Sequence, residues 1–380
     1  MKENSSAYPQ NLASGRFDGK YGSGSGNEVF YIIGGGIEMN GRLIRFATIL
    51  LIGSIVSLPA LSHADGKDDH DEKKETAFVD VAAATLWTAP DILREVDIPS
   101  ATNPVDIWQW KKDMTYEQQV QLSGDNMLET QALYGNKVNI LERDGDWVNV
   151  AVEGQPSPDN AFGYSGWMPE SQLTYTKKFD AKESEAFVLI TSPTAFLYQT
   201  PSFHHQGIEL SHNTRLPYLS ETKDAYRVMK PDGKHAWIKK EDGRRYDSSS
   251  DIPAPTGEDL VNTGKQFLGL HYLWAGMSGF GFDCSGFTFT MFQSHGITIP
   301  RDSSVQATHG EPVAIEDMQP GDLLFFAYDK GEGDVHHVAM YAGEGKMIHS
   351  PNSKKDVEII PVKTKEYFEE LSGIRRYLEK

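Results

Sequence analysis

Residues 281–289 read GFDCSGFTF and contain Cys284, the only cysteine in the chain. The segment before it, residues 271–283, is interrupted by glycines, whereas the apolar-rich residues 287–296 predict a helix. Cys284 is therefore expected where a loop becomes a helix, because backbone N–H groups there stabilise a thiolate and lower its pKa. Gly286 is expected to let a substrate backbone approach closely. A lone cysteine is more often a small buried apolar side chain than a nucleophile, so a second signal is needed.

The second signal is a pair of histidines on a predicted β-hairpin. Residues 337–350 read HVAMYAGEGKMIHS, two strands joined by a turn at residues 343–345. Counting outward from the turn places His337 opposite or nearly opposite His349, so the two side chains share a face of the hairpin. One imidazole can then hold the other in the tautomer that a base requires. The pattern predicts Cys284 as nucleophile, His337 as base and His349 as the orienting residue.

A zinc site is the alternative interpretation of the two histidines. It would need a third or fourth ligand at close spacing. His336 is adjacent to His337 on a strand and should point to the other face, so it does not complete such a site. No metal and no organic cofactor is predicted.

The middle of the chain predicts two tandem β-barrels. Residues 136–152, NKVNILERDGDWVNVAV, alternate apolar and polar residues around the turn Asp144–Gly145, and residues 163–169 add a short strand. A weaker copy of the same order follows in residues 214–240. The repetition favours two small β-barrels in series. Thr256 then provides an N-cap for a helix that opens the last domain.

The N-terminal part predicts export. Residues 39–64 combine a basic start, a short apolar run and small residues before a cleavage point after Ala64, which is typical of a secretory signal peptide. The predicted organisation is an extension outside the fold at 1–38, the signal peptide at 39–64, a charged linker at 65–78, β-barrel domains at 79–177 and 178–246, a linker at 247–257 and a last domain at 258–380 that contains Cys284 and the histidine pair. An uncleaved membrane anchor is the alternative, and the shortness of the apolar run argues against it.

Composition narrows the class of partner. The formal net charge of −18 argues against nucleic acid, whose phosphates require a basic surface. One cysteine allows no internal disulfide. We expect a secreted, monomeric protein that has no stable membrane association after signal cleavage.

Four motifs now carry a resemblance to a known family. FDCSGF, PRDSSVQ, PGDLLFF and HHVAMYAGEGKMIHS, in this order and spacing, resemble the NlpC-type family of papain-like cell-wall peptidases over residues 258–380. The repeated β segments resemble bacterial SH3-like domains. The resemblance implies an α+β fold in which two small SH3-like β-barrels precede a papain-like catalytic domain, with nucleophile, base and third polar residue at Cys284, His337 and His349.

A closer resemblance points to the γ-D-glutamyl-L-diamino acid endopeptidases of the dipeptidyl-peptidase VI type. It rests on Glu129 in ETQALYG and Tyr164 in GYSGW, together with the two SH3-like domains. Enzymes of this group cut stem peptides that begin with a free L-Ala. The resemblance places Glu129, Tyr164 and Asp283 at the free amine, and carboxylates with a phenol oxygen suit an ammonium ion.

The remaining substrate positions are also implied by this resemblance. Ser285 and the pair Asp302–Ser303 match positions that hold the L-Ala-γ-D-Glu portion, and Trp274 is a candidate wall of the site. Without the resemblance, Glu129 and Tyr164 would be read as plain surface of a barrel.

The predicted function is therefore hydrolysis of the γ-D-glutamyl–diamino acid bond in peptidoglycan-derived peptides, with release of L-Ala-D-Glu. Two alternatives stay open at this point. One is a non-catalytic peptidoglycan-binding protein built on its SH3-like domains. The other is an acyltransferase or amidase on the same scaffold, which would share the acyl-enzyme chemistry.

Overall fold

The computed structural model describes residues 75–182 and 185–378. The predicted extension, the signal peptide and residues 65–74 of the charged linker lie outside the described residues, whereas residues 76–78, also predicted as linker, belong to the first strand of the first barrel. Within the described residues, no helix is both long and apolar enough to cross a membrane.

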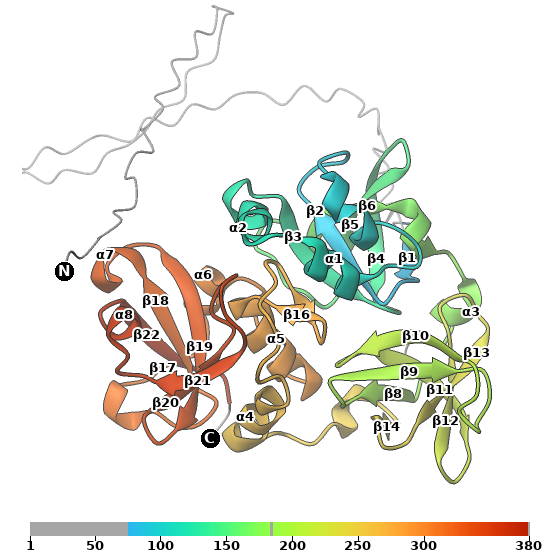
Figure 1. The fold of residues 1–380 in the computed structure, drawn as a ribbon. Coiled ribbons are helices and arrows are strands. Elements are labelled where there is room, and N and C mark those ends of the chain that lie inside the picture. The colour runs from blue at the N-terminus through green and yellow to red at the C-terminus, as the bar shows by residue number, and fades with distance from the viewer. Residues whose placement is uncertain (1–74, 183–184, 379–380) are drawn as a thin grey trace, which may run out of the picture. The chain divides into compact units, whose positions relative to one another are not determined.

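A seven-stranded sheet forms the first barrel (Figure 1). Its strands are β1 (Thr76–Val79), β2 (Ala83–Trp87), β3 (Leu128–Leu133), β4 (Lys137–Asp144), β5 (Trp147–Val152), β6 (Tyr164–Pro169) and β7 (Leu173–Thr174), in the order β3-β2-β6-β5-β4-β1-β7. The predicted hairpin is confirmed, because Asp144 pairs with Trp147 across a turn in which Gly145 has φ +57°. A positive φ at this position is the conformation that glycine adopts without strain.

A helical insertion interrupts this barrel between β2 and β3, and the sequence analysis did not predict it. It contains the 3₁₀ helix η1 (Glu95–Ser100) and the α-helices α1 (Ile107–Asp113) and α2 (Tyr116–Gly124). Both α-helices begin at side-chain caps, since Asp106 accepts from the Gln109 N–H and Thr115 forms a capping box. The buried Trp110 anchors the insertion to Trp87 of β2, with 6.1 Å between ring centroids.

The second barrel repeats the topology of the first. Short elements η2 (Glu170–Gln172) and α3 (Lys177–Asp180) lead into it. Its strands are β8 (Phe187–Ile190), β9 (Thr194–Tyr198), β10 (Gln206–Ser211), β11 (Arg215–Glu221), β12 (Ala225–Met229), β13 (His235–Lys239) and β14 (Gly243–Tyr246), in the order β10-β9-β13-β12-β11-β8-β14. Each strand takes the place of the strand seven earlier, so the predicted tandem repeat is confirmed.

The third domain places helices against a six-stranded sheet. Its helices are η3 (Ser249–Asp251), α4 (Gly257–Lys265), α5 (Cys284–Ser294), α6 (Ser303–Gln306), η4 (Ile315–Asp317), α7 (Tyr328–Gly331) and α8 (Lys365–Phe368). A small hairpin joins β15 (Met277–Ser278) and β16 (Gly281–Phe282), and the main sheet has the order β17-β22-β18-β19-β20-β21. Its strands are β17 (Glu311–Pro312), β18 (Leu323–Ala327), β19 (Val335–Gly343), β20 (Lys346–His349), β21 (Glu358–Pro361) and β22 (Leu371–Arg376). The predicted α+β class is confirmed.

Helix α4 begins at Thr256, as the sequence predicts. The Thr256 hydroxyl accepts from the Asp259 N–H, and the Asp259 carboxylate accepts from the Thr256 N–H in return. The helix ends at Lys265.

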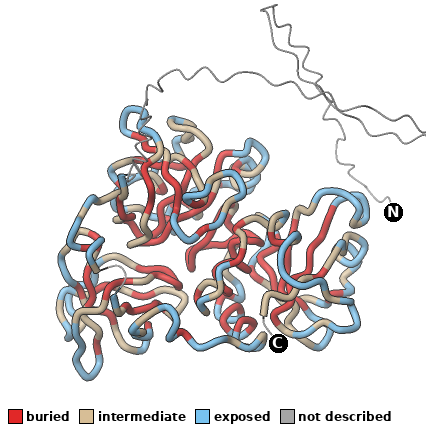
Figure 2. Tube along the Cα trace, turned by 180° about the vertical axis from the view of Figure 1, so that it is seen from behind, coloured by how far each residue is buried: buried red, intermediate tan, exposed pale blue. Residues whose placement is uncertain are grey.

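Helix α5 is the centre of the third domain. Nearly all of its residues are buried, and its apolar side chains, such as Phe287, pack with Leu260 of α4 and Val338 of β19. Figure 2 shows the exposed positions gathered on the loops around such buried elements. A helix that is apolar on every side is stable only when it is enclosed, so the position of its first residue, Cys284, is fixed by packing on all sides.

Candidate active site

Cys284 is the first residue of α5 and is only 8% exposed. Asp283 caps the helix, and its Oδ1 accepts from the Gly286 N–H at 2.6 Å. The backbone N–H groups of Ser285 and Val338 hydrogen-bond to the thiol and act to lower its pKa. The thiol therefore lies between the start of the helix and strand β19, at Val338, the residue that follows His337 in the chain.

The pKa of the thiol is the point at which the structure departs from the sequence analysis. Burial raises the pKa of Cys284 to about 12, and the negative charge of Asp283 adds to the increase. The lowering expected at a helix N-terminus is present, but it is outweighed because a buried thiolate loses its solvation. The expectation of a low pKa from the helix start alone is therefore wrong, and the thiol needs a base to ionise.

His337 and His349 provide the predicted pair. Met340 pairs with Ile348 in the hairpin, so the two histidines lie nearly opposite each other rather than in direct register. His337 Nε2 lies 2.8 Å from His349 Nδ1, which confirms the predicted contact. Because Nε2 of His337 is used in this bond, Nδ1 is the nitrogen that remains for the thiol. His336 points elsewhere, toward Glu370, as the strand alternation predicts.

Burial also determines the pKa values of the two histidines. It lowers the pKa of His337 well below its ordinary value, and the neighbouring His349 lowers it further. Burial lowers the pKa of His349 to about 4. The ring of Tyr367 packs against both imidazoles, with centroid distances of 5.5 Å and 5.0 Å. The pair is thus held neutral at neutral pH, and a neutral imidazole is the form that accepts a proton.

Tyr272 is a candidate residue that the sequence analysis missed. It is buried, and its pKa is raised well above the ordinary value by burial and then by the charges of Cys284 and Asp283. A phenol that stays protonated beside the thiol is a hydrogen-bond donor for negative charge that develops there. It lies in the glycine-interrupted segment before Cys284, and an aromatic residue in such a loop gives no local signal of its surroundings.

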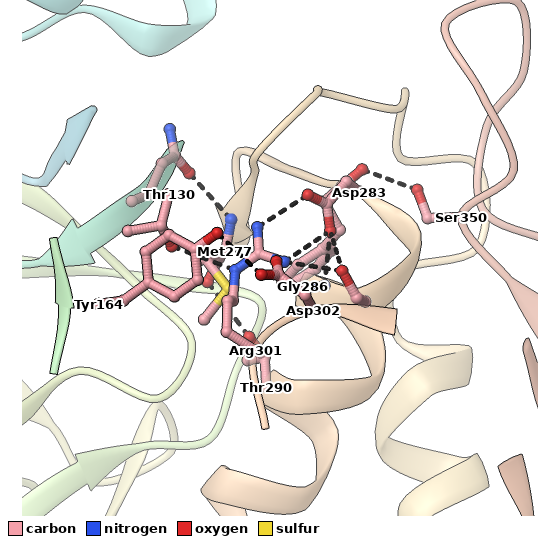
Figure 3. Close-up of polar contacts among 12 residues, drawn as sticks. Thr130, Tyr164, Met277, Asp283, Gly286, Thr290, Arg301, Asp302 and Ser350 are labelled. Carbon is pink, nitrogen blue, oxygen red and sulfur yellow. Dashed lines mark hydrogen bonds and ion pairs between the residues drawn. The ribbon is translucent and has the colours of Figure 1, made fainter. Parts of the chain in front are cut away.

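Arg301 is the second residue that the sequence analysis missed, and it organises the polar side of the site (Figure 3). Its guanidinium contacts both oxygens of Asp283, at 3.2 Å for Oδ1 and 2.7 Å for Oδ2. It also donates to the Ser285 hydroxyl at 2.8 Å and, through Nε, to Thr130 of the first barrel at 3.1 Å. Arg301 itself is 2% exposed.

This network changes the interpretation of Asp283 and Ser285. Asp283 is predicted to read the substrate's amine, yet both of its oxygens already contact Arg301 within the protein. Ser285 is predicted to hold the substrate, yet its hydroxyl donates to Asp283 at 3.3 Å and is buried. Their direct contacts with substrate stay predictions, and the roles that the structure supports are ion pairing and capping at the start of α5.

Glu129 and Tyr164 lie near Asp302, which is predicted to hold the L-Ala-γ-D-Glu portion, rather than in contact with Asp283. The Tyr164 hydroxyl donates to Asp302 Oδ2 at 2.9 Å, a bond between the first barrel and the third domain. Burial raises the pKa of Glu129, and Asp302 and Asp159 raise it further. Burial likewise raises the pKa of Asp302, although Arg301 and Tyr164 act to lower it. Two carboxylates therefore lie near each other, and only Asp302 is under the influence of a basic side chain, Arg301, which Asp302 shares with Asp283.

Ser303 and Trp274 complete the predicted set. Ser303 begins α6 directly after Asp302 and is partly exposed. Trp274 is partly buried against the cluster that contains Leu273 and Ala275, and its indole N–H has no hydrogen-bond partner among the described residues. A buried donor without a partner is costly unless something else accepts from it, which fits a residue that lines a site.

The structure gives a reason for glycine at position 286 that differs from the one expected from the sequence. A methyl group on its Cα would lie 2.1 Å from the carbonyl oxygen of Gly276. Glycine is therefore required here because the protein's own backbone approaches its Cα closely.

Over residues 75–182 and 185–378, no group of three or more His, Cys, Asp or Glu is arranged to hold a metal ion.

A buried thiol at a helix start, a histidine pair beside it and two barrels that repeat one topology define a cysteine peptidase preceded by two SH3-like domains. The chain belongs to the NlpC/P60 family, which matches residues 269–376. Residues 122–173 match the bacterial dipeptidyl-peptidase SH3 domain, and residues 190–246 match the YKFC SH3b2 domain.

Relatives extend the similarity to nearly the whole fold. The chain is 59% identical over 331 residues to a Bacillus cereus protein named gamma-D-glutamyl-L-lysine dipeptidyl-peptidase, covering 87% of this chain and 97% of that one. A Bacillus subtilis protein of the same name is 41% identical over 295 residues, covering 78% and 96%. The crystal structure of an NlpC/P60 family protein from Bacillus cereus superposes with a TM-score of 0.78 at 59% identity, covering 80% of this chain and all of that one.

Replacing Gly286 by Ala should lower both stability and activity. The added methyl group meets backbone, which cannot move aside as a flexible side chain can, so either α5 or the loop at Gly276 must shift. Chemical denaturation and peptide hydrolysis measure the two effects. Gly124→Ala, at the end of α2 with open space around it, is the control and should keep both properties. Wild-type behaviour of Gly286→Ala would show that the contact is not restrictive.

Replacing Arg301 by Met should destabilise the protein by about 3–5 kcal/mol, because the buried Asp283 carboxylate is left without its counter-ion. Denaturant unfolding measures the loss. Arg143→Met removes an exposed ion pair with Glu75 and Glu170 and should change stability by less than about 1 kcal/mol. Similar losses for the two variants would contradict the importance given to the buried pair.

Proposed function

We propose that this protein hydrolyses the γ-D-glutamyl–diamino acid bond of peptidoglycan stem peptides that begin with a free L-Ala, and releases L-Ala-D-Glu. The observation that carries the proposal is a Cys–His–His set together with a carboxylate pair, Glu129 of the first barrel and Asp302 of the third domain, in which Glu129 has no basic partner among the described residues. The names of the two Bacillus relatives specify the same bond with L-lysine as the diamino acid.

Charge balance supports recognition of an ammonium ion. Arg301 is ion-paired with Asp283 and shares its single positive charge with Asp302. No basic side chain acts on the pKa of Glu129, which is raised by burial and then by the charges of Asp302 and Asp159. Three carboxylates, those of Asp283, Asp302 and Glu129, are therefore accompanied by a single guanidinium. A substrate ammonium bound between Glu129 and Asp302 would remove their mutual repulsion and gain charge-assisted hydrogen bonds. An acetylated or glycan-linked L-Ala has no such charge and would leave Glu129 unpaired.

The chemistry follows from the geometry of the thiol and the histidines. The thiol proton of Cys284 passes to His337, and the thiolate attacks the γ-carbonyl carbon of D-Glu. Backbone N–H groups at the start of α5, with the protonated phenol of Tyr272, provide donors for the oxyanion. His337 then gives its proton to the α-amine of the leaving diamino acid, which breaks the C–N bond. Water attacks the thioester, with His337 as base, and restores the thiol.

The Cys284→Ala variant tests this chemistry. It removes the nucleophile, so release of L-Ala-D-Glu from a free tripeptide or tetrapeptide should fall to background, as mass spectrometry of the products would show. Ser294→Ala, at the other end of the same helix, changes a buried polar side chain of similar size and should retain activity. Continued release by the Cys284 variant would end the proposal.

The Glu129→Gln variant tests recognition of the amine. The KM for a free L-Ala peptide should rise roughly 10- to 100-fold, the change expected when a hydrogen bond to a charged group is lost. Wild-type enzyme should discriminate against the N-acetylated peptide, and the variant should discriminate much less. Glu142→Gln, on an exposed part of β4, is the matched control and should behave as wild type.

The same variant also has an expected effect on stability. A carboxyl whose pKa is raised by folding stabilises the protein at low pH, and this stability is lost as pH rises through the raised pKa. At pH 7 the ionised Glu129 therefore opposes folding, and Gln removes that cost. The thermal midpoint of Glu129→Gln at pH 7 should equal or exceed that of wild type. A lower midpoint together with an unchanged KM would indicate a structural role for Glu129.

A further inference from the structure

The hydrogen bond between His337 and His349 can be formed with either imidazole as the donor. Two neutral imidazoles that share one bond hold a single proton between Nε2 of His337 and Nδ1 of His349. If His337 donates, its Nδ1 is free to accept the thiol proton, and His349 carries its own proton on Nε2. If His349 donates, the proton of His337 lies on Nδ1, and His337 cannot act as a base. Catalysis therefore requires a group that favours a proton on Nε2 of His349.

Glu358 is placed to be that group. It is the Cα partner of His349 across β20 and β21, so both side chains lie on the same face of the sheet. Glu358 Oε1 lies 3.5 Å from His349 Nε2, and this nitrogen has no closer polar partner among the described residues. A carboxylate at this position attracts a nitrogen that bears a proton and repels one that presents a lone pair.

Among the charged groups around the His337–His349 pair, Glu358 is the one that contacts His349 Nε2. The His349 side chain is fully buried, whereas Glu358 is about one-third exposed and is fixed by Lys355, whose Nζ donates to Oε1 at 2.7 Å. Another titratable group, Tyr367 on α8, packs against both imidazoles, and the charge of Cys284 acts on the pKa of this same tyrosine. The charge of Lys355 lowers the pKa of His349. His336 acts on His337 from the same strand. Of these groups, Glu358 is the one in ion-pair contact with Nε2 of His349.

We infer that Glu358 is a positioning residue that selects the productive tautomer of the His337–His349 pair, an inference that rests on the proposed cysteine-peptidase chemistry. The negative charge of the Glu358 carboxylate favours a proton on His349 Nε2, His349 Nδ1 accepts from His337 Nε2–H, and His337 Nδ1 is left to take the proton of Cys284. When the thiol S–H bond breaks, the new N–H bond forms at His337 Nδ1. No proton has to reach Glu358, whose charge also favours the imidazolium that results.

A simple structural role is the competing explanation, and the exposure of the ion pair argues against it. The side chains of Lys355 and Glu358 are 45% and 31% exposed, and pairs of this kind contribute little to stability. The two explanations differ in what they expect of glutamine. Glutamine keeps the shape of Glu358, but its amide N–H₂ can donate to a lone pair on His349 Nε2 and so favours the unproductive tautomer.

The test compares Glu358→Gln, Glu358→Ala and Glu358→Asp in the full chain. In a serine protease triad, the carboxylate-to-amide change behind the histidine lowers kcat by about 10⁴ because the wrong tautomer forms. Glu358 is one imidazole further from the nucleophile and partly exposed, so we expect Gln to lower kcat roughly 10- to 100-fold with little change in KM. Ala should lower kcat less than Gln, and Asp should retain most of the activity. Glu344→Gln, on the hairpin turn away from the histidines, is the matched control and should behave as wild type.

Alkylation of Cys284 by iodoacetamide gives a readout that needs no peptide substrate. Its rate, measured from pH 4 to pH 10, follows the fraction of thiolate. For Glu358→Gln the rise in rate should move to higher pH than in wild type, and further than for Glu358→Ala. If wild type cleaves no peptide, the proposed function fails, and the alkylation profiles alone still decide whether Glu358 selects the tautomer.

Several results would overturn the inference. One is a Gln variant with the kcat and alkylation profile of wild type, and another is an Ala variant that loses as much as Gln. Lys355→Met removes the ion pair while leaving Glu358 in place, and it should not lower kcat. If Lys355→Met loses as much activity as Glu358→Gln, the ion pair itself is what matters. Should the Gln variant fail to fold, the Asp and Met variants still separate the two explanations.

Discussion

The buried ion pair between Arg301 and Asp283 is the constraint on which the site depends. A charge that is almost completely removed from water must be paired, because its desolvation is otherwise uncompensated. Asp283 caps the helix that begins with Cys284, and Arg301 also reaches Thr130 in the first barrel. The start of α5, the loop that carries Arg301 and strand β3 must therefore come together in one arrangement. The position of the nucleophile follows from that arrangement.

The first barrel consequently contributes residues to the site. Gln131 Oε1 accepts from the Met277 N–H and from the Ser278 hydroxyl, so β3 also holds the loop that precedes Cys284. Lys111 of the helical insertion donates to the carbonyl oxygens of His271 and Phe280 at the two ends of that segment, and burial lowers the pKa of Lys111 to about 8. These contacts keep the segment in place, and none of them supplies a basic partner for Glu129. The same barrel that orders the loop thus contributes the charge that we assign to substrate recognition.

Local sequence signals predicted most of the fold and the reactive residues. Alternating strands, an Asp-Gly turn, a Gly-Glu-Gly turn and the Thr256 cap are each encoded within a few neighbouring positions, and the His337–His349 contact follows from counting along one hairpin. Arg301 could not be found in this way, because its partner Thr130 is 171 residues away in the sequence. The helical insertion was missed although its caps at Asp106 and Thr115 are readable, since the β pattern of the flanking strands dominated the interpretation.

The acidity of Cys284 illustrates most clearly what a local signal omits. A helix N-terminus lowers the pKa of a thiol, but the enclosure of α5 on all sides acts in the opposite direction and is the larger effect. Burial also disfavours a charged His337, so each group alone resists ionisation. Transfer of one proton from the thiol to His337 forms both charges side by side, and their mutual attraction in a medium of low dielectric constant offsets part of the desolvation that either would suffer alone. The thiolate is therefore tied to the acceptor nitrogen of His337. Whatever fixes the tautomer of the histidine pair then controls the reactivity of the cysteine.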